Sequence, residues 1–250
     1  MKNWYSRNFN NVFFGLFLTI IISIGFDYFY GSENLLQFIL PTIIPVFSGV
    51  YLIKYKFQNI PFIFFLFFSF LGNAFGLVNL KTEDFYILNI TSLAALVSLI
   101  FISGQKFKVK EVHKLVGIYL LTVFTISLFF VYEVIDIFRY FILEDTDFYM
   151  FVLNCLGLLV FAFMSLGYYL NTQTKSAILF LTAAICFAFT SLVDYFVIYF
   201  AYNWNFIFLH KLLYVVGLYQ IIKFMIEEHS LNRLKPIEDY EVYYSEITFA

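Results

Sequence analysis

Asp194 is the residue whose type and setting most strongly indicate chemistry, because it is a carboxyl inside a long apolar run of the sequence. Burying a carboxylate away from water is costly unless it is paired and hydrogen-bonded. Two roles fit Asp194. It could be a general acid or substrate ligand, or a structural carboxyl that bonds a neighbouring helix or pairs with His210 or Lys211.

Other scarce polar residues also lie in apolar runs of the sequence. His210 is the second candidate catalytic residue, as a base, a ligand or the ion-pair partner of Asp194. An amide can bond a substrate or a partner helix, but it cannot donate a proton in catalysis. The candidates for substrate binding, with helix-to-helix bonding as the alternative, are Asn73, Asn89, Asn154 and Tyr214.

Several familiar reaction centres have no counterpart in the sequence. It contains no nucleophile elbow, phosphate-binding glycine loop, HExxH or paired CxxC. His113, His210 and His229 are scattered, so no metal site is predicted and no cofactor is implied. Cys155 and Cys186 fall inside apolar runs and are expected to pack as inert residues.

The composition indicates the elements that must hold these residues. The chain is 62% hydrophobic and 13% charged, whereas soluble domains carry roughly 25% charged residues. A soluble fold of this length could not cover so much apolar surface, so the sequence predicts an integral membrane protein. The net charge of −2 offers no basic excess for nucleic acid. A membrane lipid or lysolipid is the expected partner, and the oligomeric state is left open.

Apolar segments predict an all-α, polytopic transmembrane bundle of about eight helices, since a span needs about 20 mainly apolar residues. Pro41 and Pro45 fall inside the second span and are expected to bend it. Residues 1–226 form the predicted membrane domain, and residues 227–250 form an acidic tail expected to be mobile and cytoplasmic. The expected spans are 10–30, 35–53, 61–80, 86–103, 112–133, 148–170, 176–200 and 205–226.

The distribution of Lys and Arg predicts the orientation. With eight spans, the side that holds both termini receives twelve of these residues, and the other side receives only Lys81, Arg139 and Lys211. This positive-inside bias predicts that both termini are cytoplasmic. Abundant Phe, Ile, Asn and Lys with few Gly and Pro indicate an AT-rich bacterial genome, and therefore the bacterial inner membrane.

A faint internal repeat appears when the chain is shifted by 121 residues. Spans three and four then fall on spans seven and eight without a gap, with Asn73 on Asp194 and Asn89 on His210. This pattern raises the hypothesis of two duplicated four-helix halves related by a pseudo-two-fold axis along the membrane normal.

The repeat places scarce polar groups at one depth. Asn73 and Asp194 each lie six or seven residues from the outer end of their expected span, about 10 Å below the outer boundary. The sequence therefore predicts a polar layer in the outer half of the bilayer, with Tyr214 beside it. Its members are Asn73, Asn89, Asn154, Asp194 and His210.

Short motifs in four of the spans resemble those of the YhhN family of eight-span membrane proteins, which includes the lysoplasmalogenases. The resemblance covers roughly residues 35–226 and rests on Leu40-Pro41, Phe68–Asn73, Ser191–Asp194 and Tyr219-Gln220. The chain departs from the family's pattern in four ways. A Lys is replaced by Leu40 and a third-span Asp by Asn73, the fourth span lacks a His, and the Ser and Asp of the seventh span are not adjacent. The resemblance thus implies the fold more directly than the activity.

The resemblance implies hydrolysis of the vinyl-ether bond of lysoplasmalogen or a related lysolipid, giving a fatty aldehyde and a glycerophospho-alcohol. Asp194 would be the acid and His210 would orient water.

Two other classes stay open: a non-catalytic lipid-binding or sensing protein, and a small transporter. A transporter should carry interrupted helices and polar residues at both faces. The inner half offers little of this beyond Pro41, Pro45 and Gln220.

Overall fold

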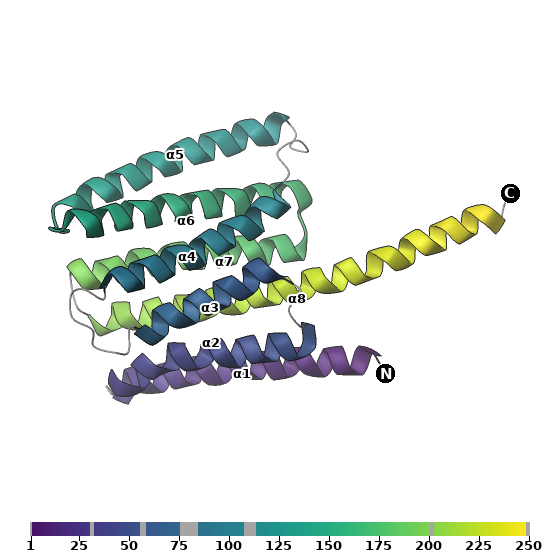
Figure 1. Cartoon of the computed structure of the whole chain (residues 1–250), viewed down its shortest axis with the longest axis horizontal. Helices are drawn as coiled ribbons and strands as arrows, with labels where there is room; N and C mark the ends of the chain where they lie inside the picture. Colours follow the sequence, from purple (N-terminus) through teal and green to yellow (C-terminus); the bar gives the residue numbers. More distant parts are fainter. Residues whose placement is uncertain are drawn as a thin grey trace.

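A computed structural model describes residues 2–30, 33–55, 59–75, 85–107, 114–200 and 203–248. Within these ranges the chain forms eight α-helices and no β-strand (Figure 1), which confirms the predicted all-α bundle. The helices are α1 (Lys2–Tyr30), α2 (Glu33–Tyr55), α3 (Ile60–Phe75), α4 (Phe85–Lys106), α5 (Lys114–Arg139), α6 (Asp145–Thr172), α7 (Lys175–Tyr199) and α8 (Trp204–Thr248).

Each predicted span has its helix, and the differences lie at the ends. The third span was expected over 61–80, but α3 ends at Phe75 and residues 76–80 lie outside the described residues. The fifth span was expected to end at 133, but α5 continues to Arg139. Polar residues such as Glu133 and Asp136 are tolerated there because helices continue through the headgroup region, where water is available.

The apolar helices make this chain an integral membrane protein. Among the described residues, six helices contain segments long and apolar enough to cross a bilayer, in α1, α4, α5, α6, α7 and α8. The described apolar parts of α2 and α3, Leu40–Ile53 and Ile60–Phe75, are shorter. Large apolar side chains also cover the outside of the bundle, with Leu115 of α5 80% exposed and Phe129 64% exposed. Such a surface suits lipid and not water.

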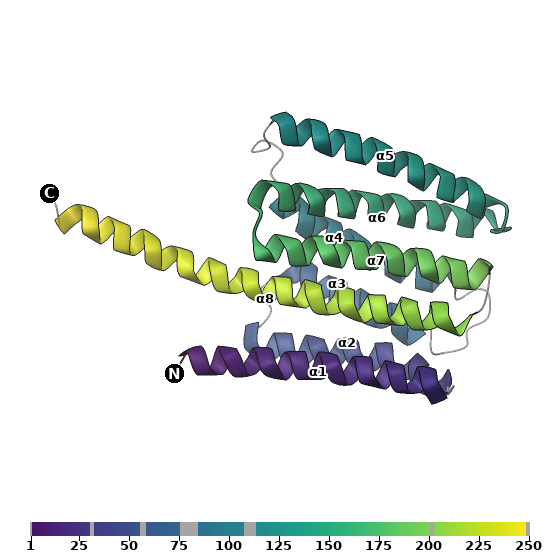
Figure 2. The same cartoon turned by 180° about the vertical axis from the view of Figure 1, so that it is seen from behind.

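Six of the helices form a closed ring in the order α2, α3, α4, α6, α7 and α8, and α8 returns to α2. Helix α1 packs outside the ring on α2 and α8, and α5 packs outside it on α6. Figure 1 shows α3 and α4 on the near face, and Figure 2 shows α7 and α8 on the opposite face. The ring therefore places the two hairpins α3–α4 and α7–α8 on opposite faces of the bundle.

The packing pattern supports the hypothesis of a duplicated chain. In the first half of the chain, α1 packs on α2, α2 on α3 and α3 on α4. The helices four places later pack in the same way: α5 on α6, α6 on α7 and α7 on α8. The contact between α2 and α8 likewise corresponds to that between α6 and α4. Only the α1–α8 contact lacks a counterpart of similar extent among the described residues. A pseudo-two-fold axis along the bundle would produce this pattern.

A tight turn sets α6 and α7 side by side. Gln173 adopts a left-handed conformation with φ 48°, and its backbone N–H donates to the carbonyl oxygen of Tyr169 at 2.8 Å. The Thr174 hydroxyl then caps α7 by accepting from the backbone N–H of Ala177 at 3.3 Å. These two caps satisfy backbone groups that the helix ends would otherwise leave unpaired.

The core of the ring is aromatic. The side chains of Phe161, Phe180 and Phe224 are fully buried, with ring centroids 5.4 Å apart for the first two and 4.6 Å apart for the last two. Edge-to-face and tilted contacts of this kind add to the stabilisation from burial. A second buried cluster joins α5, α6 and α7 at the other end of the bundle. It consists of Phe138, Ile142, Phe151, Cys155 and Tyr195.

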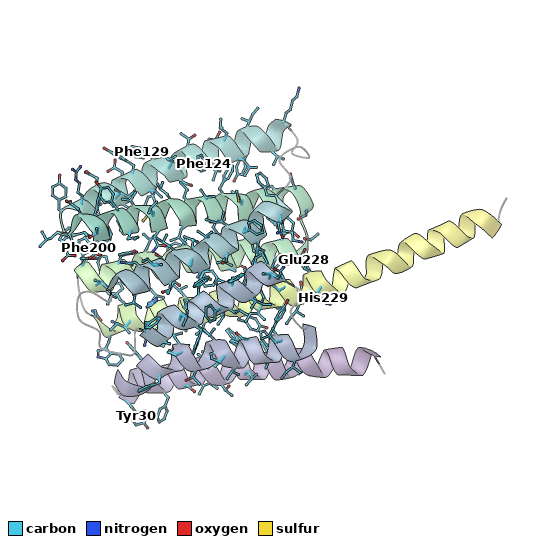
Figure 3. All side chains as sticks on the ribbon, in the orientation of Figure 1. Tyr30, Phe124, Phe129, Phe200, Glu228 and His229 are labelled. Atoms are coloured by element: carbon cyan, nitrogen blue, oxygen red, sulfur yellow. The ribbon has the colours of Figure 1, made fainter. Side chains whose placement is uncertain are left out.

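The chain termini mark one end of the bundle, here called the terminal end, and α8 extends beyond it as one continuous helix (Figures 1 and 2). Glu228 and His229 lie where α8 leaves the bundle (Figure 3), and an ion pair joins Glu228 to Lys106 in the last turn of α4. The backbone of the predicted tail is thus helical as far as Thr248. Its mobility and its cytoplasmic location stay predictions.

Candidate functional site

The structure brings Asp194 and His210 together across the α7–α8 hairpin. Oδ1 of Asp194 lies 3.7 Å from Nδ1 of His210. Asp194 is five residues from the end of α7, and His210 is six residues from the start of α8. Both residues therefore lie about 8–9 Å along the helix from the end of the bundle opposite the termini, here called the far end.

The position of Asp194 on α7 explains how a carboxyl is accommodated there. Ala183, Phe187 and Thr190 form a buried stripe along one face of α7 at helical spacing, and Asp194 is the next position of that stripe. Its side chain is nevertheless 48% exposed, and that of His210 is 22% exposed. The inward face of α7 is thus sealed by packing along most of its length and opens at the level of Asp194.

The distance between the two groups suits an acid–base pair in the absence of substrate. A direct hydrogen bond would bring the nitrogen and oxygen to 2.7–3.2 Å. At 3.7 Å the two groups are close but do not form a direct hydrogen bond. Catalytic contacts are often longer in the free protein and shorten when substrate is bound. A carboxyl and an imidazole at this spacing can hold one proton and orient one water molecule.

Tyr214 lies one helical turn beyond His210, on the same face of α8. Its hydroxyl accepts a hydrogen bond from Nδ2 of Asn73 at 3.2 Å, and the same amide nitrogen donates to the carbonyl oxygen of Ser69 at 2.7 Å. The ring of Tyr214 also meets Phe187 edge-on at 5.8 Å. Tyr214 thereby joins α3, α7 and α8 directly beneath the Asp194–His210 pair.

Asn154 lies in a different setting. It is buried on α6, and its Nδ2 donates to the hydroxyl of Tyr195 at 3.2 Å. Tyr195 follows Asp194 in the chain, but it points about 100° around the helix into the cluster of Phe138 and Phe151. The amide is therefore held within the α5–α6–α7 packing, and its predicted role in substrate binding stays a prediction.

Asn89 is buried on α4 with 8% of its surface exposed. It belongs to the same hairpin as Asn73, and the two helices approach closely there. A Cβ placed on Gly72 would lie 3.1 Å from the hydroxyl oxygen of Thr91. Asn89 is thus buried in the α3–α4 hairpin, and its role in binding stays a prediction.

Tyr195, the hydrogen-bond partner of Asn154, was not predicted from the sequence. Tyr195 directly follows Asp194 within an apolar run, at the level expected for Asn154. The chain contains 20 tyrosines, so a single tyrosine in such a run does not stand out. Among the described residues, no group of three or more His, Cys, Asp and Glu side chains could hold a metal ion.

The fold and this polar cluster define an all-α integral membrane protein in which a carboxyl and an imidazole lie 3.7 Å apart near the far end of the bundle. Comparison with protein-family models, curated proteins and solved structures found no match. The resemblance to the YhhN family accordingly stays a prediction made from the sequence.

Proposed function

We propose that this protein is a YhhN-like membrane hydrolase that cleaves the vinyl-ether bond of lysoplasmalogen or a related lysolipid. The observation that carries the proposal is the contact between Asp194 and His210 across the α7–α8 hairpin. The Asn73–Tyr214 hydrogen bond, one turn deeper, fixes the position of α8 beneath His210.

The proposed reaction needs one proton donor and one water molecule. Asp194 acts as the acid and gives a proton to the outer carbon of the enol ether, which creates an oxocarbenium-like cation beside the Asp194 carboxylate. Water oriented by His210 adds to the cationic carbon and passes its extra proton to the Asp194 carboxylate. The hemiacetal then collapses to a fatty aldehyde and a glycerophospho-alcohol, so no atom or electron is left over.

The depth of the pair suits this substrate. Helix α7 is about 38 Å long, close to the 40–45 Å thickness of a bilayer with its headgroups. Asp194 lies about 8 Å from the end of the helix, near the base of the headgroup region. The vinyl-ether bond of a lysolipid lies at this level, between the glycerol and the hydrocarbon chain.

The same proposal includes an orientation. Twelve Lys and Arg residues on the terminal side against three on the far side support cytoplasmic termini. In a bacterial inner membrane the pair would then face the outer leaflet.

The test is release of fatty aldehyde from lysoplasmalogen by the protein in nanodiscs. Wild type and Tyr195→Phe should release aldehyde, whereas Asp194→Asn should be at least about 100-fold slower, since general acids contribute 10²–10⁴-fold. Tyr195→Phe is the matched control, because it removes a hydroxyl at the same depth outside the pair. Equal rates for wild type and Asp194→Asn would refute the assigned acid.

A non-catalytic lipid-binding or sensing protein is the second candidate. It is favoured by Asn73, an amide held by Ser69 and Tyr214 where the family has a carboxylate. Saturable lysolipid binding without aldehyde release, in protein shown to be folded, would select this candidate.

A further inference from the structure

A pocket of about 210 Å³ opens between α1 and α8, toward the terminal end of the bundle. It lies at the opposite end from the Asp194–His210 pair and shares no residue with it. Ligand sites usually measure roughly 300–1,000 Å³, so this pocket has room for one end of an amphiphile and not for a whole lipid. The lining residues are Phe13, Phe14, Tyr219, Lys223 and Ile226.

Stacked rings hold the wall of this pocket in place. The ring of Tyr219 is stacked on Phe17 with centroids 4.2 Å apart, and on Phe13 with centroids 5.0 Å apart. Phe13 and Ile226 are buried, whereas Phe14 is 48% exposed. The inner wall is therefore preformed, and the side of the pocket at Phe14 opens toward the surrounding lipid.

Lys223 carries the only charge among the described residues that line the pocket. It lies within the apolar segment Trp204–His229 of α8, six residues or about 9 Å from the end of that segment. A lysine at this position could extend its side chain to the headgroups. Its Nζ instead lies 5.9 Å from the centre of the Tyr219 ring, one turn deeper. The ammonium group is therefore held in apolar surroundings, below the headgroups.

An ammonium group in such surroundings is costly unless an opposite charge or a hydrogen-bond acceptor meets it. The Tyr219 ring meets part of this need through a cation–π contact. The side chains of Phe13, Phe14 and Ile226, which form the rest of the described lining, cannot accept a hydrogen bond. Glu227 does not line the pocket and has an interaction of its own. The pocket therefore offers a ligand one positive charge and no negative charge.

These features fit an amphiphile with one negative charge and a small head. The phosphate of a phospholipid lies in the headgroup region, above the level of the ammonium group. A carboxylate at the end of a single chain has no glycerol or headgroup beyond it. It can therefore lie at this depth when a cation is there to donate to it.

We propose that this pocket binds the carboxylate end of one free long-chain fatty acid from the leaflet at the terminal end. The carboxylate accepts a charge-assisted hydrogen bond from Nζ of Lys223, which stays over the Tyr219 ring. The first carbons of the chain lie against Phe13 and Ile226, and the rest of the chain passes Phe14 into the bilayer. This binding is independent of the proposed hydrolysis, because it uses other residues at the other end of the bundle.

The probe is palmitic acid, offered with an equal amount of hexadecanol, which has a chain of the same length and no charge. Both are added to the protein in phosphatidylcholine nanodiscs. The ligand retained after transfer to detergent is counted by native mass spectrometry. Wild type should retain one palmitate with about tenfold preference over hexadecanol, the factor expected from one charge-assisted hydrogen bond. Equal retention of the two, or retention of phosphatidylcholine in their place, would overturn the proposal.

Charge variants assign the contact. Lys223→Gln should lose the preference for palmitate, and Lys223→Arg should keep it. Glu227→Gln should also keep it, because Glu227 does not line the pocket. Lys175→Gln, at an exposed lysine of the same end, is the matched control and should behave as wild type. Equal palmitate retention by Lys223→Gln and Lys175→Gln, in variants with wild-type thermal transitions, would show that the pocket is not the site.

Discussion

The hairpins α3–α4 and α7–α8 occupy equivalent places in the ring but carry different chemistry. In α3–α4 the matching polar positions are the neutral amides Asn73 and Asn89. In α7–α8 they are Asp194 and His210, and these two groups lie 3.7 Å apart. One hairpin therefore carries hydrogen-bonding amides where the other carries groups that can exchange a proton.

Under the duplication hypothesis, the difference means that two equivalent hairpins have taken on different roles. Ionisable groups are costly within a bilayer and are retained where they serve a function or a partner. Neutral amides can join helices at lower cost, as Asn73 does by bonding Tyr214 of α8. On this view, α3–α4 positions α8 at Tyr214, and α7–α8 performs the proposed chemistry.

The largest expected effect comes from replacing the imidazole. His210→Gln gives α7–α8 an amide like that at Asn89, so aldehyde release should fall about 100-fold, within the range typical of general acid–base groups. The measurement is the rate in nanodiscs with folded protein. A fall of less than threefold would mean that His210 does not orient the water.

Gly217 tests the packing of the α7–α8 hairpin. A Cβ at this position would lie 3.2 Å from Cβ of Cys186 and 3.3 Å from the ring of Phe187. Gly217→Leu should therefore destabilise the bundle by about 1–3 kcal/mol through overpacking, measured as a lower midpoint of thermal unfolding in micelles.

Substitutions at two other glycines provide comparisons for the effect of Gly217→Leu on the unfolding midpoint. Gly72→Leu in α3–α4 should cost less than Gly217→Leu, because its close neighbour is the single hydroxyl of Thr91. Gly25→Leu should leave the midpoint unchanged, since a Cβ there meets no atom within 4 Å. A larger shift for Gly25→Leu than for Gly217→Leu would contradict the packing described for α7–α8.

Asn73→Asp tests whether a carboxylate in the α3–α4 hairpin can contribute to the proposed hydrolysis as Asp194 does in α7–α8. A second carboxylate facing Tyr214 should stabilise the cationic intermediate and raise the rate of aldehyde release about tenfold. Asn154→Asp supplies the control, because it adds a carboxyl at similar depth within the α5–α6–α7 packing. If both variants released aldehyde faster, the added negative charge would explain the increase, and the position of the carboxylate beside Tyr214 would not matter.

The smallest expected effects are those of the two amide–tyrosine hydrogen bonds. Tyr214→Phe and Tyr195→Phe should each cost about 0.6 kcal/mol, the average for hydrogen bonds between helices in a membrane. Double-mutant cycles with Asn73→Leu and Asn154→Leu measure each coupling. If the Tyr214 hydroxyl positions α8 and thereby His210, Tyr214→Phe should also slow aldehyde release, whereas Tyr195→Phe should not.

Much of the fold could be predicted from the chain, because a span is a local property. About 20 consecutive apolar residues suffice to define a membrane helix, and all eight expected spans have a helix in the structure. The helix ends were less predictable. α5 continues to Arg139 and α8 to Thr248, since polar residues beyond the hydrocarbon core do not stop a helix.

The candidate site was predictable in part. Asp194 and His210 could be paired because they flank a short connection and match Asn73 and Asn89 in the repeat. The partners of the amides could not be predicted. Asn73 bonds Tyr214 and Asn154 bonds Tyr195, and both contacts join residues distant in the chain.

The sequence by itself determined that this is an all-α membrane protein and that scarce polar residues lie inside its apolar helices. Both follow from residue type and counting along the chain. Only the tertiary structure decided that Tyr214 faces Asn73 beneath the Asp194–His210 pair and that Asn154 is held by Tyr195. The physical reason is that helices apolar on nearly every face carry little information about their own rotation. Close packing against their neighbours supplies it.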